Sequence, residues 1–233
     1  MDRELLVSEY KDGVPVADSC MIEGLDKIFS WKRGFQNCFT GFPNSGKTTM
    51  TLYLMVVKSL KSGWKWVFWS PEMRSGSFVN GKVRVHYNDL INEIVTIISG
   101  KTVYKHISEK YKTTRIALEE YLDILDWVEK HFIPLNPKKK DKEYIYNLLK
   151  KTYDDFGYDG ILIDPFKNIE HDMKLRDDIY LDRLFGMFLD LAIETNAVMN
   201  WIAHPKSNVE RIRNVQGTQQ LIPCNQFMLA YGS

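Results

Sequence analysis

The chain has 233 residues, of which 44% are hydrophobic and 26% are charged, and its formal net charge is +1. This composition is typical of an ordinary globular protein and excludes disordered and collagen-like chains. Because the net charge is close to zero, no global positive field attracts nucleic acid, so any contact with phosphate must come from local clusters of cations. The length is sufficient for one large hydrophobic core.

Three widely separated cysteines, Cys20, Cys38 and Cys224, include no CxxC pair. We therefore expect free thiols in a reducing compartment, not a disulfide framework or a zinc site. The first residues, MDRELLVSEYKDG, lack the basic start and the apolar stretch of a signal peptide. No apolar run approaches the ~20 residues that span a bilayer. The sequence thus predicts a cytoplasmic protein without a membrane partner.

Short apolar runs alternate with helical patterns along the chain, which favours a parallel sheet covered by helices. In chain order we expect a strand at 35–40, a helix at 49–63, a strand at 64–70, helices at 89–100 and 115–131, a strand at 131–137, a helix at 143–157, a strand at 159–166, a helix at 180–196, and strands at 197–204 and 226–232. The region between the second and third strands is expected to be mostly helical. This order, with right-handed crossovers, predicts a single doubly wound, mainly parallel α/β domain.

The segment GFPNSGKTT lies between the first expected strand and the first expected helix, and it matches the phosphate-binding pattern G-x-x-x-x-G-K-[ST]. Its glycines permit the tight turn that points N–H groups at a phosphate, at a helix start where the dipole favours an anion. Lys47 would reach the β- and γ-phosphates of ATP, and the Thr48 hydroxyl would bind Mg²⁺. A surface turn that matches by chance is the alternative. The residues expected to bind the nucleotide are Gly41, Pro43, Asn44, Ser45, Gly46, Lys47, Thr48 and Thr49.

Two carboxylates follow expected strands and are candidates for the chemistry of hydrolysis. Asp164 ends the apolar run GILID, where an acidic side chain could help hold the Mg²⁺ ion. It could instead cap the turn at Pro165. Glu72, in WSPEM, follows the strand after the phosphate-loop helix and could orient or deprotonate the attacking water. A solvated glutamate in a turn opened by Pro71 is the alternative for this position.

Five motifs occur in the following order along the chain: GLDKIF with RGFQNCFTG, then GFPNSGKTT, FWSPEM, ILIDPF and NWIAHPKS. Together they resemble the RecA-like motor domain of replicative helicases of the DnaB and Twinkle type, a group that includes many phage helicases. The resemblance implies that Glu72 positions the catalytic water, with Lys47 in the same catalytic set, and that Asp164 is associated with magnesium. It also implies that His204 senses the γ-phosphate and signals its loss to a DNA-binding loop.

The resemblance further implies a set of partners. In ring helicases of this type, loops after two central strands line the pore, and here these loops would be residues 167–178 and 205–217. The second contains Lys206, Arg211 and Arg213, which could contact phosphates whatever the base sequence; an ordinary solvated loop is the alternative. The implied cofactors are ATP and Mg²⁺. The implied partners are single-stranded DNA, copies of the chain in a hexameric ring, and a primase or loader, in the cytoplasm of a bacterium or a phage-infected host.

We expect residues 1–23 to form an N-terminal extension or linker and residues 24–233 to form the motor domain. The family continues through strands that supply an arginine finger to a neighbouring subunit, and no arginine follows Arg213, so we expect this domain to lack those strands. The predicted function is an ATP-dependent helicase motor. The alternatives are a RecA-like recombination or regulatory ATPase, a nucleoside or small-molecule kinase, and a nucleotide-gated binding module with little hydrolysis.

Overall fold

The computed structural model describes residues 2–13, 17–42, 44–79, 82–171 and 176–204. At its centre lies a five-stranded sheet in the order β3-β9-β8-β4-β7, in which every neighbouring pair is parallel. Its strands are β3 (Gln36–Thr40), β4 (Trp66–Trp69), β7 (Phe132–Pro134), β8 (Gly160–Ile163) and β9 (Val198–Ala203). All five were expected from the sequence, whereas the strand expected at 226–232 lies outside the described residues.

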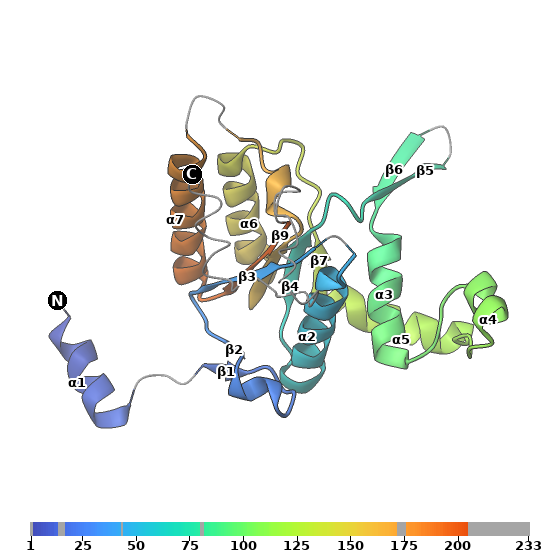
Figure 1. The fold of residues 1–233 in the computed structure, drawn as a ribbon, viewed down its shortest axis with the longest axis horizontal. Helices are drawn as coiled ribbons and strands as arrows, with labels where there is room; N and C mark the ends of the chain where they lie inside the picture. The colour runs from blue at the N-terminus through green and yellow to red at the C-terminus, as the bar shows by residue number, and fades with distance from the viewer. Residues whose placement is uncertain (1, 14–16, 43, 80–81, 172–175, 205–233) are drawn as a thin grey trace, which may run out of the picture.

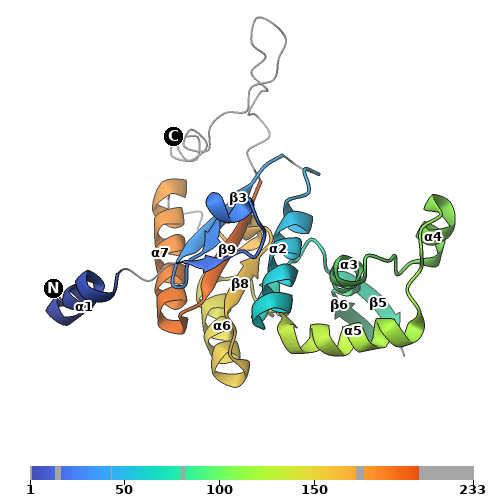
Figure 2. The ribbon, with the colours of Figure 1, turned by 90° about the horizontal axis from the view of Figure 1, so that it is seen from below.

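Helices cover both faces of this sheet (Figure 1 and Figure 2). One face carries α6 and α7, and the other carries α2, with α3 and α5 packed next to it. Their bounds are α2 (Lys47–Ser62), α3 (Asn88–Ser99), α5 (Leu118–His131), α6 (Lys142–Phe156) and α7 (Asp177–Thr195). No helix in the described part of the chain is long and apolar enough to cross a lipid bilayer.

Burial on both faces explains the continuous apolar strands. Every residue of β4 and of β8 is buried. Because successive side chains of a strand point to opposite faces, Trp66 and Phe68 lie in the core with α2, α3 and α5, while Val67 and Trp69 lie in the core with α6 and α7. Strands that are buried on both sides are characteristic of doubly wound sheets. The expected doubly wound, mainly parallel α/β fold is therefore confirmed.

The structure also contains elements that the sequence did not lead us to expect. They are α1 (Arg3–Asp12), β1 (Asp18–Ser19), η1 (Leu25–Lys27), β2 (Ser30–Trp31), β5 (Ser75–Val79), β6 (Lys82–His86), α4 (Lys105–Tyr111) and η2 (Phe166–Asn168). The expectation of a mostly helical region after β4 was wrong for β5 and β6, which pair antiparallel. A sequence signal for this hairpin exists, since Asn-Gly between alternating runs favours a tight hairpin turn, and Asn80-Gly81 stands between SGSFV and KVRVH.

A buried lysine attaches the segment before β3 to the sheet's helical layer. Lys58, in α2, is 1% exposed, and its Nζ lies 3.3 Å from Asp18 Oδ1 and 3.1 Å from the carbonyl oxygen of Ser19. The same ammonium lies 4.6 Å from the centroid of the Trp64 ring. A buried ammonium requires such partners, because an unpaired one would carry a large desolvation cost. β1 is thereby tied to α2.

A close approach within the sheet joins Gly160 and Trp66, which are partners across β8 and β4. A Cβ on residue 160 would lie 2.1 Å from Trp66 Cζ3. The indole is held in place, because its Nε1 donates to the Met55 carbonyl oxygen at 3.1 Å and to Ser59 Oγ at 2.9 Å. We expect Gly160→Ala to lower the free energy of unfolding by about 1–3 kcal/mol, the usual cost of overpacking, in urea denaturation followed by circular dichroism.

Gly186→Ala is the matched control. Gly186 lies inside α7, and a Cβ there would meet nothing within 4 Å. Alanine is the better helix former, so this variant should gain up to about 1 kcal/mol. Equal stability of Gly160→Ala and the wild type would contradict the close approach of β8 to the indole.

Candidate active site

The segment that matches the phosphate-binding pattern connects β3 to α2. Gly46 is the N-cap of α2 and has a left-handed φ of 80°, and Asn44 also has a positive φ, of 60°. A Cβ on Gly41 would lie 3.0 Å from Ser45 Oγ. Glycine at position 46 is therefore favoured by the backbone conformation and glycine at position 41 by space. Pro43 lies outside the described residues.

Lys47 folds back over this loop. Its Nζ donates hydrogen bonds to the carbonyl oxygens of Gly41 at 2.7 Å and Phe42 at 2.8 Å. Partial burial lowers the pKa of Lys47, although the charges of Asp164 and Glu72 act in the opposite direction. The loop thus presents an ammonium beside the amino end of a helix, where the backbone N–H groups of the first turn have no partners within the helix.

Asp164 lies directly after β8 and is only 3% exposed. Its Oδ2 accepts a hydrogen bond from Thr48 Oγ1 at 2.8 Å and a longer one from Ser70 Oγ at 3.5 Å. Burial raises the pKa of Asp164, and the hydrogen bonds from the two hydroxyls oppose that rise. The structure therefore brings together Thr48 and Asp164, the two residues expected to hold a cation, and adds Ser70, which the sequence did not single out.

Glu72 follows β4 and lies between Lys167 and His204. Its Oε1 is 2.9 Å from Lys167 Nζ, and its Oε2 is 3.5 Å from His204 Nε2. Burial acts to raise the pKa of Glu72, but the hydrogen bonds and charges of Lys167 and His204 together outweigh burial, so the pKa is lowered. The Glu72 side chain is thus held as a carboxylate.

The remaining expected site residues fall into two groups. Asn44, Ser45 and Thr49 are exposed at the loop and in the first turn of α2. Lys206, Arg211 and Arg213 lie outside the described residues. Lys167 was expected only as the first residue of a pore segment, and the structure instead places its ammonium on Glu72. No sequence pattern could have found this pair, since the contact joins η2 to the end of β4.

The donor set fits a magnesium ion that is bound together with a nucleotide. Among the described residues, no group of three or more histidine, cysteine, aspartate and glutamate side chains could hold a metal. Magnesium in nucleotide sites uses one or two carboxylates and takes further ligands from phosphates and water. The Thr48 hydroxyl and the Asp164 carboxylate, 2.8 Å apart at the start of α2, match that need.

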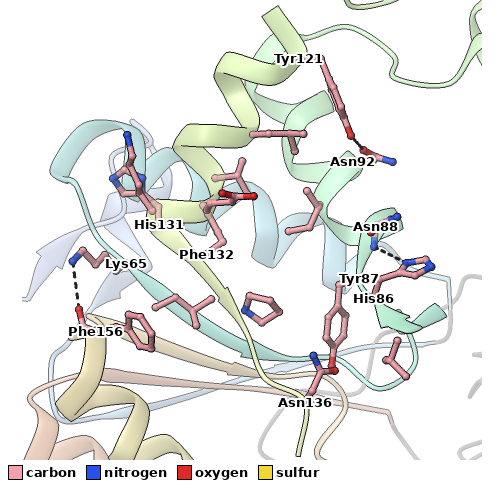
Figure 3. A pocket seen from close by; sticks show the side chains of 18 residues that line it. Lys65, His86, Tyr87, Asn88, Asn92, Tyr121, His131, Phe132, Asn136 and Phe156 are labelled. Atoms are coloured by element: carbon pink, nitrogen blue, oxygen red, sulfur yellow. Dashed lines mark hydrogen bonds between the residues drawn. The ribbon is translucent and has the colours of Figure 1, made fainter. Parts of the chain in front are cut away.

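A cavity of about 1110 Å³ lies elsewhere, between β7, α3 and α5 (Figure 3). Its wall includes Tyr87, Tyr121, His131 and Phe132 and none of the site residues described above. The candidate site is therefore an open surface at the carboxyl edge of the sheet, which is where ligands bind in doubly wound folds.

The buried position of Asp164 generates a stability prediction. We expect Asp164→Asn to raise the free energy of unfolding by roughly 1 kcal/mol at pH 7 without nucleotide or magnesium, a common gain when a buried functional charge is removed. The pKa of Asp164 is raised in the folded state, so the wild-type carboxyl favours folding at low pH and loses this contribution as pH rises through that value. The variant's advantage should therefore shrink as pH falls below the ordinary aspartate value of 3.8.

Urea denaturation over a pH series would measure this difference. Asp123→Asn is the control, because Asp123 is exposed on α5 and its replacement should change stability by no more than about 0.5 kcal/mol. If Asp164→Asn were less stable than the wild type at pH 7, the hydrogen bonds from Thr48 and Ser70 would outweigh the cost of burial, and our sign would be wrong.

Comparisons with known proteins bear on both sequence and fold. The chain is 22% identical over 196 residues to the Twinkle homolog protein, chloroplastic/mitochondrial, of Arabidopsis thaliana, a match that covers 79% of this chain and 25% of that protein. Its structure is similar to the solved ATPase domain of a phage helicase of the DnaB family, with a TM-score of 0.66, 15% identity, and coverage of 90% of this chain and 73% of that one. A KaiC-like protein from Pyrococcus horikoshii matches with a TM-score of 0.47 and 13% identity, over 81% of this chain and 70% of that one. No family model matches the chain.

The chain spans about a quarter of the length of the Twinkle homolog, so the likeness concerns one domain of that protein. The match in sequence and the match in fold agree with each other and with the order of the five motifs. The resemblance to the RecA-like ATPase domain of DnaB- and Twinkle-type helicases is thus confirmed, and the fold of this chain is that of a RecA-like ATPase domain.

Proposed function

We propose that this chain is a helicase-type motor domain that binds ATP with Mg²⁺ at the loop between β3 and α2 and hydrolyses it to move along single-stranded DNA. The observation that carries the proposal is the hydrogen bond of 2.8 Å between Thr48 and Asp164, which lie 116 positions apart in the sequence. It unites the hydroxyl at the start of the phosphate-loop helix with the carboxylate at the end of a central strand. A nucleotide-bound magnesium ion needs this pair.

Each residue of the site then has a physical task. The N–H groups at the start of α2 bind phosphate oxygens, and Lys47 exchanges the carbonyl oxygens of Gly41 and Phe42 for the β- and γ-phosphates. Thr48 and Asp164 hold the cation, which when bound neutralises charge that develops on the phosphates. These steps position the nucleotide, and they leave the proton of the attacking water to another group.

Glu72 is the group that we assign to this water. Its carboxylate is ionised and 47% exposed, so it is able to orient a water molecule and to accept its proton. His204, at 3.5 Å from Glu72, lies where a change at the γ-phosphate would pass to the residues that follow it. We propose that those residues, including Lys206, Arg211 and Arg213, contact DNA.

The proposed assembly follows from the resemblance. We propose that residues 24–233 act as the motor domain in a homo-oligomeric, hexameric ring in the cytoplasm, with a primase or loader as partner. One observation favours a second candidate, a nucleotide-gated module with little hydrolysis: Lys167 and His204 each lie against one oxygen of Glu72. Such engagement lowers the basicity of the carboxylate.

Hydrolysis of ATP with and without single-stranded DNA, together with mass determination in ATP and Mg²⁺, tests the proposal. DNA-stimulated turnover by an assembled ring supports the motor, and strand displacement on a forked duplex distinguishes a helicase from a recombinase. Tight ATP binding by a monomer with negligible turnover, unchanged by DNA, supports the binding module. Phosphoryl transfer to a small acceptor without any effect of DNA supports a kinase.

Two substitutions separate nucleotide binding from hydrolysis. Lys47→Ala removes the ammonium that would meet the phosphates, and we expect nucleotide binding to weaken at least tenfold in fluorescence titration, the effect of losing about 1.4 kcal/mol or more. Glu72→Gln keeps the shape of the side chain and removes its basicity, so we expect near-normal binding with turnover reduced about 10²-fold or more. Retained tight binding in Lys47→Ala would remove the phosphate-loop assignment, and an unchanged rate in Glu72→Gln would return Glu72 to a solvated turn.

Double replacement of Arg211 and Arg213 by alanine tests the DNA contact. Each phosphate contact contributes close to one unit to the salt dependence of single-strand binding, so we expect weaker binding and a slope of log K against log salt that is shallower by about 1–2. Fluorescence anisotropy with a labelled oligonucleotide at several salt concentrations measures both quantities. Unaltered affinity and slope would assign the DNA contact to other residues.

A further inference from the structure

The contact between Lys167 and Glu72 is not required by any part of the chemistry described so far. Lys167 lies in η2, the turn that follows Asp164, and its ammonium contacts Glu72 Oε1 at 2.9 Å. The other oxygen of Glu72 lies 3.5 Å from His204 Nε2. Both oxygens of the group that we assign to the attacking water are therefore engaged by side chains of the protein itself.

This engagement opposes the task of Glu72. A carboxylate that already accepts a charge-assisted hydrogen bond is a weaker base, and the efficiency of proton abstraction falls with basicity. A lysine is also absent from the set of groups that the proposed hydrolysis needs around its base, namely the phosphate loop, the cation ligands and the water. The ion pair thus favours a resting arrangement of the site over a reacting one.

The ion pair is also easy to break. The side chains of Lys167 and Glu72 are 55% and 47% exposed, and ion pairs at such positions are weak and are screened by salt. A phosphate group is a stronger competitor for an ammonium than a single carboxylate oxygen, since it offers more acceptor oxygens and more charge. Lys167 is accessible to such a group because its ammonium lies at the carboxyl edge of the sheet, on the same side as the phosphate loop.

We propose that Lys167 is a positioning residue that restrains Glu72 in the resting protein, and that a phosphate group releases Glu72 by taking the ammonium. The proposal rests on the proposed function, because it assumes that Glu72 acts on the attacking water. The phosphate has two sources, the backbone of single-stranded DNA and the bound nucleotide. Release by the DNA backbone would make Lys167 the link through which DNA stimulates hydrolysis.

The charged and titratable groups that face Glu72 come from four elements. Lys167 lies on η2, His204 follows β9, Lys47 begins α2 and Asp164 follows β8, and all four act on Glu72 or are acted on by it. Only Lys167 is within 3 Å of its carboxylate oxygens in the described ion pairs. Its replacement is therefore expected to change the basicity of Glu72 more than replacement of an exposed lysine elsewhere.

The test uses the full chain with Lys167→Met, Lys167→Arg and Lys61→Met. Lys61 is exposed in the last turn of α2, at the end opposite the phosphate loop, and controls for the loss of one surface lysine. We expect Lys167→Met to raise DNA-independent ATP turnover roughly threefold or more, in line with a more basic Glu72. The stimulation by single-stranded DNA should fall by the same factor, and Lys167→Arg and Lys61→Met should behave as the wild type.

A second readout does not depend on turnover. The pKa of Glu72, followed by carbon NMR of labelled glutamate and assigned with Glu72→Gln, should rise in Lys167→Met and stay unchanged in Lys61→Met. Adding a single-stranded oligonucleotide or a non-hydrolysable ATP analogue with Mg²⁺ should raise the pKa more in the wild type than in Lys167→Met. A larger shift with the oligonucleotide assigns the release to the DNA backbone, and a larger shift with the analogue assigns it to the nucleotide.

The outcomes distinguish a failure of this inference from a failure of the proposed function. A wild type that hydrolyses no ATP removes the proposed function, and the NMR shifts still decide whether Lys167 restrains Glu72. Turnover in Lys167→Met at or below the wild-type rate, or a Glu72 pKa that is unchanged by the substitution, would overturn the restraint. Equal shifts in the wild type and Lys167→Met on adding either phosphate source would overturn the release.

Discussion

The buried carboxylate of Asp164 is the group on which the rest of the site depends. A charge at 3% exposure is costly unless polar groups surround it. Here Thr48 supplies a hydroxyl from the first turn of α2, and Ser70 supplies another from the end of β4. The carboxylate therefore holds the phosphate-loop helix and two central strands in one arrangement. Its raised pKa indicates that this arrangement is maintained against the cost of burial, as is common where a site is built to meet a cation.

The parallel sheet makes that arrangement possible. Neighbouring strands β4, β8 and β9 all run in the same direction, so their carboxyl ends open at one edge, and Ser70, Glu72, Asp164 and His204 all follow those ends. The same sheet requires apolar side chains on both faces, which is why β4 and β8 contain only buried residues. Packing and chemistry are thus separated along each strand: its middle supplies the core, and the residues after its end supply the polar groups.

Glu72 and Lys47 show how charges are held at such a site. Lys47 is bound by two carbonyl oxygens of its own loop, and Glu72 is bound by Lys167 and His204. Each charge is satisfied by groups of the protein, and each must exchange partners to act on a nucleotide. Such exchange costs little because every partner is replaced by a phosphate or a water that makes an equivalent contact. The site can therefore remain ordered in both states.

The sequence by itself determined the fold class, the five strands of the central sheet, the helices that cover it and the place of the phosphate loop. These features depend on local periodicity and on glycine at Gly41 and Gly46, which neighbouring residues reveal. The hairpin of β5 and β6 escaped because the surrounding helical patterns dominated the region. Only the tertiary structure decided that Ser70 joins Asp164 and that Lys167 contacts Glu72. Such contacts join residues far apart in the sequence, and their distances are set by how the sheet orders its strands, a property that no single segment contains.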